Sequence, residues 1–357
     1  MFCWANQRLT SGVLEPTGAA VQMQQRETRM VSLGETLEAV DARMQAGAEL
    51  DVRSISSGFP LLDGVLGGGL HVGELLLLSG APGVGKTIMS LQMARNIAQA
   101  GGQVLFACYE HEPAILLARL LAMEAGFSGR DESLSRTVLA GLTAGDSDGR
   151  RLDEILASTP AGSDALTAVR AYEAQFIFVE ASGARTTSDE LKRIVAERPD
   201  KSRLAVLFVD YLQKIPLLPE PETEAEKVTR TVEALKDLAM DAHISIVLNS
   251  AIDTGGMRAN RVRIHHLRGS SAAAFEADVV LMLNDKFKAV SKVHLTYDSV
   301  RARTFRDFLI VSVEKNRGGP SLVDLEFRKD FSHFRLDPNG AFVTDKLIDE
   351  RLDETII

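Results

Sequence analysis

The chain has 357 residues, of which 45% are hydrophobic and 25% are charged, and its formal net charge is −9. This composition supplies enough apolar side chains for a sizeable core, and it excludes a largely disordered chain, a collagen-like repeat and a disulfide scaffold. The acidic balance excludes a uniformly basic nucleic-acid-binding protein, but it is compatible with a local basic patch.

Two cysteines, Cys3 and Cys108, are too few for a four-thiolate zinc site and favour a reducing compartment. The longest purely aliphatic stretch near the middle of the chain spans residues 75–78, far less than the ~20 residues of a membrane helix. The chain does not begin with a basic segment followed by an apolar block, so we expect no signal peptide. These features predict a cytoplasmic protein without a membrane partner.

Residues 1–30 show no periodicity, and we expect a poorly ordered tail. A linker helix is predicted within residues 31–50, because Ser32 and Glu35 match a capping box and apolar residues follow at helical spacing. The apolar stripe of this helix consists of Leu33, Leu37, Val40 and Met44. Since the helix precedes the main domain, its stripe must pack on that domain or on a neighbouring subunit.

Residues 51–337 alternate apolar runs with helical segments, which predicts an α/β domain with helices on both faces of a mainly parallel, twisted sheet. The predicted strands are 75–79, 104–108, 176–179, 204–209, 244–248, 279–283, 308–313 and 322–327. The predicted helices are 87–99, 113–125 and 225–241. The last strands have shorter connections and predict a C-terminal antiparallel extension. Residues 338–357 carry more acidic than basic residues and predict a solvated tail.

A glycine-rich motif lies between the first predicted strand and the helix that follows it. It matches G-x-x-x-x-G-K-[ST] in full, with residues Gly80, Ala81, Pro82, Gly83, Val84, Gly85, Lys86 and Thr87. In such a loop the backbone N–H groups bind phosphates, the lysine reaches the β- and γ-phosphates and the hydroxyl binds Mg²⁺. The order of strand, loop and helix therefore predicts an ATP site with Mg²⁺.

Two further acidic residues follow predicted strands. Asp210 ends the strand at 204–209, the position of the carboxylate that supports Mg²⁺ in a Walker B motif. Glu110 follows the strand at 104–108, where it would lie beside the γ-phosphate and polarise the attacking water. Glu112 is the alternative base, and a surface acid that caps the next helix is the alternative interpretation of Glu110.

The sequence VDYLQ at residues 209–213 resembles a signature of DnaB-type replicative hexameric helicases. Other stretches are similar to that family: SGF at 57–59, GGGL at 67–70, FEADVV at 275–280 and KNRGGP at 315–320. The resemblance extends in order from about residue 33 to 337 and implies a RecA-like P-loop NTPase core. It places the nucleotide-binding roles on Lys86, Thr87, Glu110 and Asp210.

The same resemblance implies that Lys315 and Arg317 reach across a subunit interface to the neighbour's γ-phosphate. A cation supplied in trans would neutralise the charge that develops during phosphoryl transfer. The predicted linker helix stands where the family's linker helix packs on the adjacent subunit and closes a homo-oligomeric, hexameric ring. An exposed pair of bases at a strand end is the alternative interpretation of Lys315 and Arg317.

The segment from Asp253 to Arg268, the basic segment, contains four arginines and one acid. Loops of the family at this place line a central channel and hold single-stranded DNA by its phosphates, which implies that role for Arg258, Arg261 and Arg263. Arg268 matches an interface-proximal arginine instead. An ordinary solvated loop is the alternative.

The chain departs from the family pattern in three places. The helical N-terminal domain is missing before the linker helix, so a protein partner is expected in its place. Asn249 and Ser250 stand where a glutamine senses the γ-phosphate, and we expect Asn249 to bind phosphate or water. Residues 286–306 form a long connection of mixed charge where the family has a short acidic one.

The leading hypothesis is an ATP-hydrolysing, ring-forming motor of DNA replication that acts on single-stranded DNA as a helicase or translocase. One alternative is a regulatory or assembly ATPase resembling KaiC, which the acidic charge and the missing helical domain favour. Another is a recombination ATPase resembling RadA, since KNR at residues 315–317 is similar to its KNR motif, but the chain lacks a zinc-binding cysteine set. VDYLQ and the linker helix favour the motor.

Overall fold

The computed structural model describes residues 30–46, 54–129, 134, 149, 151–269, 271–290 and 299–348. The tail predicted over residues 1–30 lies outside these ranges except for Met30, and so does Cys3. Within the described ranges, no helix combines the length and the apolar character that crossing a bilayer requires.

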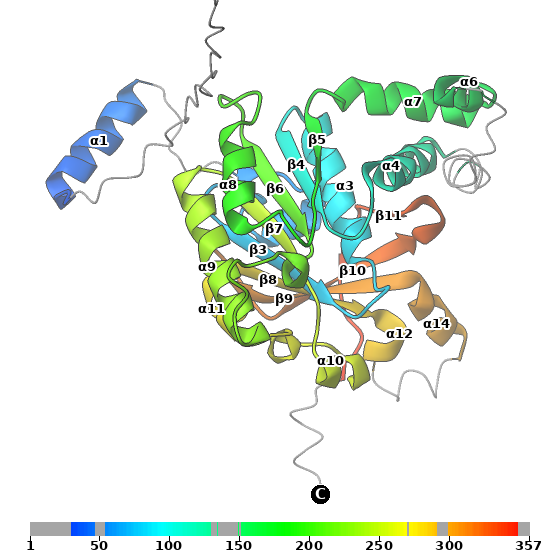
Figure 1. Ribbon diagram of the computed structural model, residues 1–357. Coiled ribbons are helices and arrows are strands. Elements are labelled where there is room, and N and C mark those ends of the chain that lie inside the picture. The colour runs from blue at the N-terminus through cyan, green and yellow to red at the C-terminus, as the bar shows by residue number, and fades with distance from the viewer. Residues whose placement is uncertain are drawn as a thin grey trace, which may run out of the picture. The chain divides into compact units, whose positions relative to one another are not determined.

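The described strands form a two-stranded sheet and a ten-stranded mixed sheet (Figure 1). The small sheet pairs β1 Ser54–Ile55 with β2 Leu70–His71. The strands of the large sheet are β3 Leu75–Gly80, β4 Gln103–Cys108, β5 Phe176–Glu180, β6 Ala205–Asp210, β7 Ser245–Ser250, β8 Val279–Asp285, β9 Phe308–Asn316, β10 Val323–Asp330, β11 Arg335–Leu336 and β12 Ala341–Phe342.

The large sheet has the order β11-β10-β9-β8-β3-β7-β6-β4-β5, and β12 also pairs with β10. All pairings from β8 through β3, β7, β6 and β4 to β5 are parallel, whereas β8 to β12 pair in antiparallel fashion. The predicted parallel core with a C-terminal antiparallel extension is therefore confirmed. Every residue of β3, β4, β6 and β7 is buried, as continuous apolar runs predict.

Helices cover both faces of this sheet (Figure 1). Side chains of α3 and α4 pack on one face, and side chains of α8, α9 and α11 pack on the other. The helices are α1 Leu33–Gln45, α2 Pro60–Val65, α3 Lys86–Gln99, α4 Pro113–Ser128, α6 Leu152–Ala157, α7 Pro160–Tyr172, α8 Ser188–Ala196, α9 Glu224–Asp241, α10 Thr254–Arg258, α11 Ala272–Glu276, α12 Lys286–Ala289 and α14 Ser299–Thr304. Short 3₁₀ turns occur at η1 Leu212–Lys214, η2 Ile264–His266, η3 Phe305–Asp307 and η4 Phe331–His333.

Helix α1 begins with the predicted capping box. The Ser32 hydroxyl oxygen accepts the Glu35 N–H at 3.1 Å, and the Glu35 carboxylate accepts the Ser32 N–H at 2.8 Å. The apolar side chains that α1 leaves exposed include Leu33, Leu37 and Met44. An amphipathic helix gains most of its stability when such a stripe is buried, so this surface is suited to contact another protein surface.

The prediction of a solvated tail over residues 338–357 is wrong for residues 341–348. Strand β12 pairs with β10, and the Ile348 N–H donates to the Ala289 carbonyl at 2.8 Å. Asp345 is buried and forms an ion pair with the buried Lys286 at 2.8 Å. A buried ammonium group requires a counter-charge, and this acid supplies part of it. Residues 349–357 lie outside the described ranges.

Candidate active site

The phosphate-binding loop lies where the sequence predicts it, between β3 and α3. Gly85 precedes α3 and has a φ of 115°, in the left-handed region that favours glycine. A Cβ atom at this position would lie 2.8 Å from the ring of Phe331. Glycine is therefore required both for the turn of the backbone and for the close approach of the C-terminal hairpin.

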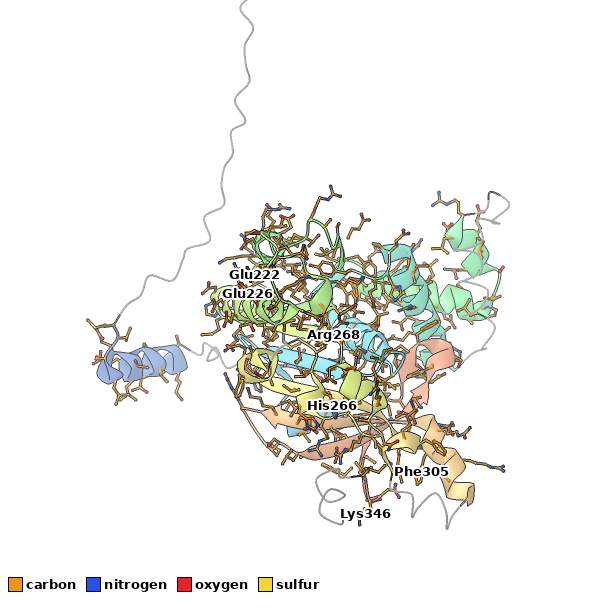
Figure 2. All side chains as sticks on the ribbon, turned by 60° about the horizontal axis from the view of Figure 1, so that its bottom comes forward. Glu222, Glu226, His266, Arg268, Phe305 and Lys346 are labelled. Atoms are coloured by element: carbon orange, nitrogen blue, oxygen red, sulfur yellow. The ribbon has the colours of Figure 1, made fainter. Side chains whose placement is uncertain are left out.

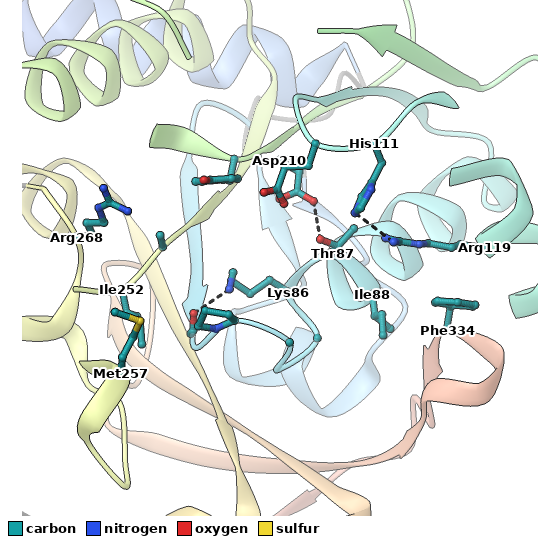
Figure 3. A pocket seen from close by; sticks show the side chains of 17 residues that line it. Lys86, Thr87, Ile88, His111, Arg119, Asp210, Ile252, Met257, Arg268 and Phe334 are labelled. Carbon is teal, nitrogen blue, oxygen red and sulfur yellow. Dashed lines mark hydrogen bonds between the residues drawn. The ribbon is translucent and has the colours of Figure 1, made fainter. Parts of the chain in front are cut away.

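The loop borders a cavity of about 460 Å³ at the carboxyl ends of the parallel strands (Figure 3). Ligands of open α/β sheets bind at this edge. The predicted site residues that line the cavity are Gly80, Pro82, Gly83, Gly85, Lys86, Thr87, Glu110 and Asp210. Ala81 and Val84 belong to the loop but are not among the lining residues.

Lys86, the first residue of α3, turns its ammonium group into the loop. Its Nζ donates to the carbonyl oxygens of Gly80 at 2.8 Å and Ala81 at 3.1 Å. Burial lowers the pKa of Lys86, and the negative charges of Asp210 and Glu110 oppose that change. An ammonium group held at the base of such a loop can neutralise phosphate oxygens.

Thr87 and Asp210 meet although they are far apart in sequence. The Thr87 hydroxyl donates to Asp210 Oδ2 at 2.6 Å, and Asp210 is buried at the end of β6. Mg²⁺ prefers oxygen ligands and often takes only one or two from the protein, so this pair fits the predicted metal site. In the part of the chain that the structure describes, no group of three or more His, Cys, Asp or Glu side chains is arranged to hold a metal ion.

Glu110, and not Glu112, lines the cavity. Cys108 of β4 pairs with Asp210 of β6, so the chain after β4 enters the site beside the Asp210 carboxylate. Glu112 is exposed and takes the position before the first residue of α4. This placement favours Glu110 as the group that faces an attacking water.

His111, Arg119 and Phe334 also line the cavity, although no sequence motif predicted them as site residues. Arg119 Nη2 lies 3.1 Å from His111 Nε2, and the Arg119 guanidinium lies 5.5 Å from the centroid of the Phe334 ring. Burial lowers the pKa of His111, and the charge of Arg119 lowers it further. The local sequence contains no signal for this cluster, because packing brings it together from α4 and the C-terminal hairpin.

Two residues of the basic segment, Met257 and Arg268, border the cavity on the side away from Arg119 and Phe334 (Figure 3). His266 and Arg268 of this segment are labelled in Figure 2. Arg268 forms an ion pair with Glu224 of α9 at 2.9 Å. Gln213, from VDYLQ, links this segment to the end of β7. Its Oε1 accepts the Ala251 N–H and its Nε2 donates to the Arg268 carbonyl, both at 3.1 Å.

The structure does not support the expectation that Asn249 binds phosphate or water, because this residue does not line the cavity. Asn249 is buried, does not line the cavity, and donates from Nδ2 to the Ser90 hydroxyl of α3 at 3.1 Å. Side chains alternate across a strand, so the next residue, Ser250, points to the other face. Its hydroxyl oxygen accepts a hydrogen bond from Gln213 Nε2 at 3.1 Å.

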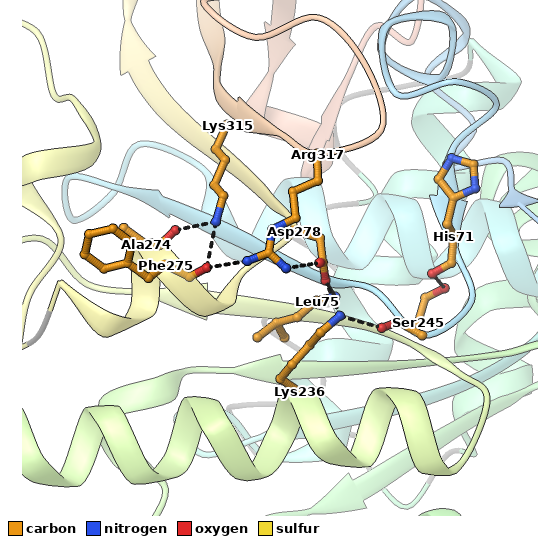
Figure 4. Close-up of polar contacts among 10 residues, drawn as sticks. His71, Leu75, Lys236, Ser245, Ala274, Phe275, Asp278, Lys315 and Arg317 are labelled. Carbon is orange, nitrogen blue, oxygen red and sulfur yellow. Dashed lines mark hydrogen bonds and ion pairs between the residues drawn. The ribbon is translucent and has the colours of Figure 1, made fainter. Parts of the chain in front are cut away.

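Lys315 and Arg317 are not among the residues that line the cavity. They lie beside α11 (Figure 4), where Lys315 Nζ donates to the carbonyls of Ala274 at 2.8 Å and Phe275 at 2.7 Å. Arg317 forms an ion pair with Asp278 at 3.0 Å. Burial lowers the pKa of Lys315, and the charge of Arg317 lowers it further. Neither base contributes to the cavity of the chain itself.

The prediction that Arg258, Arg261 and Arg263 all bind DNA requires correction. Arg261 is buried and pairs with both carboxylate oxygens of Asp324, at 2.7 and 2.8 Å. Arg263 forms an ion pair with Glu314, whose side chain is 3% exposed. Both guanidinium groups neutralise acids of the sheet and anchor the basic segment to it. Arg258 is exposed and stays available to a polyanion.

The sequence model of the DnaB-like helicase C terminal domain matches residues 54–336. The chain belongs to the DnaB-like helicase C-terminal domain family. The match begins at β1 and ends at β11, and it therefore includes every element that borders the cavity.

Curated relatives of this DnaB-like chain include replicative helicases. The replicative DNA helicase DnaB of Treponema pallidum (strain Nichols) is 25% identical over 285 residues, which cover 80% of this chain and 56% of that protein. DnaB of Rickettsia prowazekii (strain Madrid E) is 24% identical over 329 residues, 85% of this chain and 62% of that protein. The chain thus spans less than two thirds of the length of these relatives.

A third relative matches only a short part of the chain. The DNA repair protein RadA of Campylobacter jejuni is 45% identical over 64 residues, 18% of this chain and 14% of that protein. A match of this length does not support the RadA-like alternative against the DnaB-like family, whose model covers most of the chain.

Solved structures share the fold of the DnaB-like domain. One solved ATPase domain has a TM-score of 0.66 and 15% identity, and the alignment covers 86% of this chain and 99% of that one. A DnaB-like replicative helicase, described with its interactions with primase, has a TM-score of 0.64 and 15% identity over 87% of this chain and 68% of that one. The predicted RecA-like fold class is confirmed.

Proposed function

We propose that this chain is an ATP-hydrolysing motor that assembles into a ring, expected to be a hexamer, and acts on single-stranded DNA as a helicase or translocase. Membership of the DnaB-like family supports this function. The placement of the predicted site residues supports this function most directly. Lys86, Glu110 and Asp210 share one cavity, whereas Lys315 and Arg317 lie outside it. A second copy of the chain would complete the site by bringing these two bases to its neighbour's nucleotide.

In the proposed mechanism, the loop N–H groups and the start of α3 bind the ATP phosphates. Lys86 exchanges its carbonyl partners in the loop for phosphate oxygens. Thr87 and Asp210 would hold Mg²⁺, which supplies charge neutralisation when bound. Glu110 accepts the proton of the attacking water, and Arg317 of a neighbouring subunit stabilises the charge of the transferring phosphoryl group.

The exposed stripe of α1 is proposed to hold the ring together. In the double variant Leu33→Ser/Leu37→Ser, we expect light scattering to detect species smaller than the ring. ATPase activity should also fall, because Arg317 then has no neighbouring nucleotide site to complete. At a dilution where the wild type is also dissociated, the thermal midpoint should not differ between the two proteins, since both side chains are exposed in the chain itself. Glu38→Gln, on the same helix, is the matched control. An unchanged mass, or a lowered thermal midpoint, would instead place the stripe on its own domain.

The decisive experiment for the motor is ATP hydrolysis with and without single-stranded DNA, together with DNA binding at several salt concentrations. Arg258→Ala should weaken binding and reduce the salt slope by about 0.7 for each phosphate that it no longer binds, with a stability change within about 0.5 kcal/mol. Arg261→Ala should instead destabilise the fold by about 3 kcal/mol, because it leaves Asp324 without its buried partner. Thermal unfolding distinguishes the two effects.

If the wild-type chain neither binds single strands at low salt nor hydrolyses ATP faster in their presence, the motor is excluded. The regulatory or assembly ATPase would then be the function to test. Equal effects of Arg258→Ala and Arg261→Ala on thermal stability would contradict the distinct roles assigned to them.

A further inference from the structure

Asp278 is the centre of a buried polar cluster directly before β8 (Figure 4). Its Oδ2 accepts hydrogen bonds from Lys236 Nζ at 2.7 Å and from the Leu75 N–H at 2.8 Å, and its Oδ1 accepts one from Arg317 Nη1 at 3.0 Å. The side chains of Asp278 and Lys236 are 7% and 15% exposed, whereas that of Arg317 is 52% exposed. One buried carboxylate is thus shared by a buried cation and an exposed one.

Each group that Arg317 contacts also has another donor, although on Asp278 the other donors bind Oδ2 and Arg317 binds Oδ1. Arg317 Nη2 donates to the Phe275 carbonyl at 2.8 Å, and Lys315 Nζ donates to the same carbonyl at 2.7 Å. If the Arg317 side chain moves away, Asp278 keeps Lys236 and Phe275 keeps Lys315. It is costly to leave a buried carboxylate or carbonyl group without any donor, and Lys236 and Lys315 keep Asp278 and Phe275 from that loss. The Arg317 side chain is therefore the member of the cluster that can leave it most easily.

We propose that Asp278 and the Phe275 carbonyl form a resting position for Arg317, and that Lys236 is a positioning residue that sets how readily Arg317 leaves it. This inference rests on the proposed role of Arg317 at a neighbour's nucleotide. Lys236 weakens the hold of Asp278 on Arg317, because two cations compete for one carboxylate. When two subunits meet, the Arg317 guanidinium leaves Asp278 and binds the γ-phosphate of the nucleotide in the neighbouring subunit.

Lys236→Met tests the competition, since it keeps the apolar stem and removes the cation. We expect kcat for ATP hydrolysis by the assembled protein to fall about tenfold with an unchanged KM, because Arg317 is held more tightly. Lys236→Arg restores the charge and should keep the wild-type kcat. Lys192→Met is the matched control, because it removes a lysine from an exposed pair with Asp241 at 3.8 Å.

Removing the carboxylate should have the opposite effect. Asp278→Asn weakens the hold on Arg317 and should give a kcat at or above that of the wild type, and Lys236→Met/Asp278→Asn should recover most of the activity that Lys236→Met alone loses. Added salt should also raise the kcat of Lys236→Met, since the Arg317 side chain of the screened ion pair is 52% exposed. Light scattering and thermal unfolding would verify that the variants compared are folded and assembled.

Two results would overturn the resting position. One is a wild-type kcat in Lys236→Met at equal assembly, as expected if Lys236 only braces the fold. The other is a slow, folded Asp278→Asn. Arg317→Ala tests the proposed function separately. A wild-type rate in Arg317→Ala would refute the role in trans, whereas a slow Arg317→Ala beside a normal Lys236→Met would refute the resting position alone.

Discussion

Replacing Lys86 with alanine should abolish ATP hydrolysis and leave the fold intact. We expect kcat to fall at least about 100-fold, because the cavity loses the ammonium group that neutralises phosphate oxygens. The fold should tolerate the change, because the hydrogen bonds of the Lys86 ammonium group within the described residues go to the carbonyls of Gly80 and Ala81, which line or border the open cavity. Steady-state phosphate release measures the first effect, and thermal unfolding measures the second.

Lys201→Ala is a suitable control for Lys86→Ala, because Lys201 is an exposed lysine far in sequence from the loop. It should hydrolyse ATP at the wild-type rate. If Lys86→Ala retains hydrolysis within a few-fold of the wild type, the assignment of the loop as the phosphate site is wrong.

Replacing Glu110 with glutamine should preserve nucleotide binding and block turnover. An amide has nearly the shape of the carboxylate but cannot accept the proton of the attacking water, so we expect kcat to fall by about 10²–10⁴. The Kd for ATP should change little, since Lys86, Thr87 and the loop N–H groups stay in place. Single-turnover hydrolysis and equilibrium titration with ATP measure the two quantities.

Glu112→Gln is the matched control, because Glu112 is exposed, follows Glu110 by two residues and does not line the cavity. It should hydrolyse ATP normally. Normal turnover in Glu110→Gln together with slow turnover in Glu112→Gln would reverse the assignment of the base.

Much of the nucleotide site was predictable because its residues are adjacent in sequence or end an apolar strand. The loop from Gly80 to Thr87 carries its own strand, turn and helix, and Asp210 ends a buried run. In a parallel sheet these strand ends meet at one edge, so local pattern and strand direction were enough to bring Thr87 and Asp210 together. The end of the cavity beside Arg119 and Phe334 had no such sequence pattern, since these two residues meet through packing of segments far apart in the chain.

The errors at charged residues share one cause, which is that sequence shows the charge of a residue but not its partner. The sequence shows Arg261 and Arg263 as two cations of a basic segment. In the structure, Asp324 of β10 and Glu314 of β9 neutralise them. Asp345 looks like part of a solvated tail, yet a buried lysine holds it inside the domain. Desolvation makes an unpaired buried charge costly, so distant acids and bases pair wherever the fold brings them together.

The sequence by itself determined the fold class, the loop, the proximity of Thr87 and Asp210 and the capping box of α1, because each depends on contacts within a few residues or on the end of a strand. Only the tertiary structure decided that Glu110 rather than Glu112 lines the cavity, that Asn249 bonds to Ser90 and does not line it, and that Arg317 lies outside it beside Asp278. Those outcomes depend on which face a side chain takes and on which distant group pairs with it. Both are set by the packing of the whole sheet and its helices rather than by local propensity.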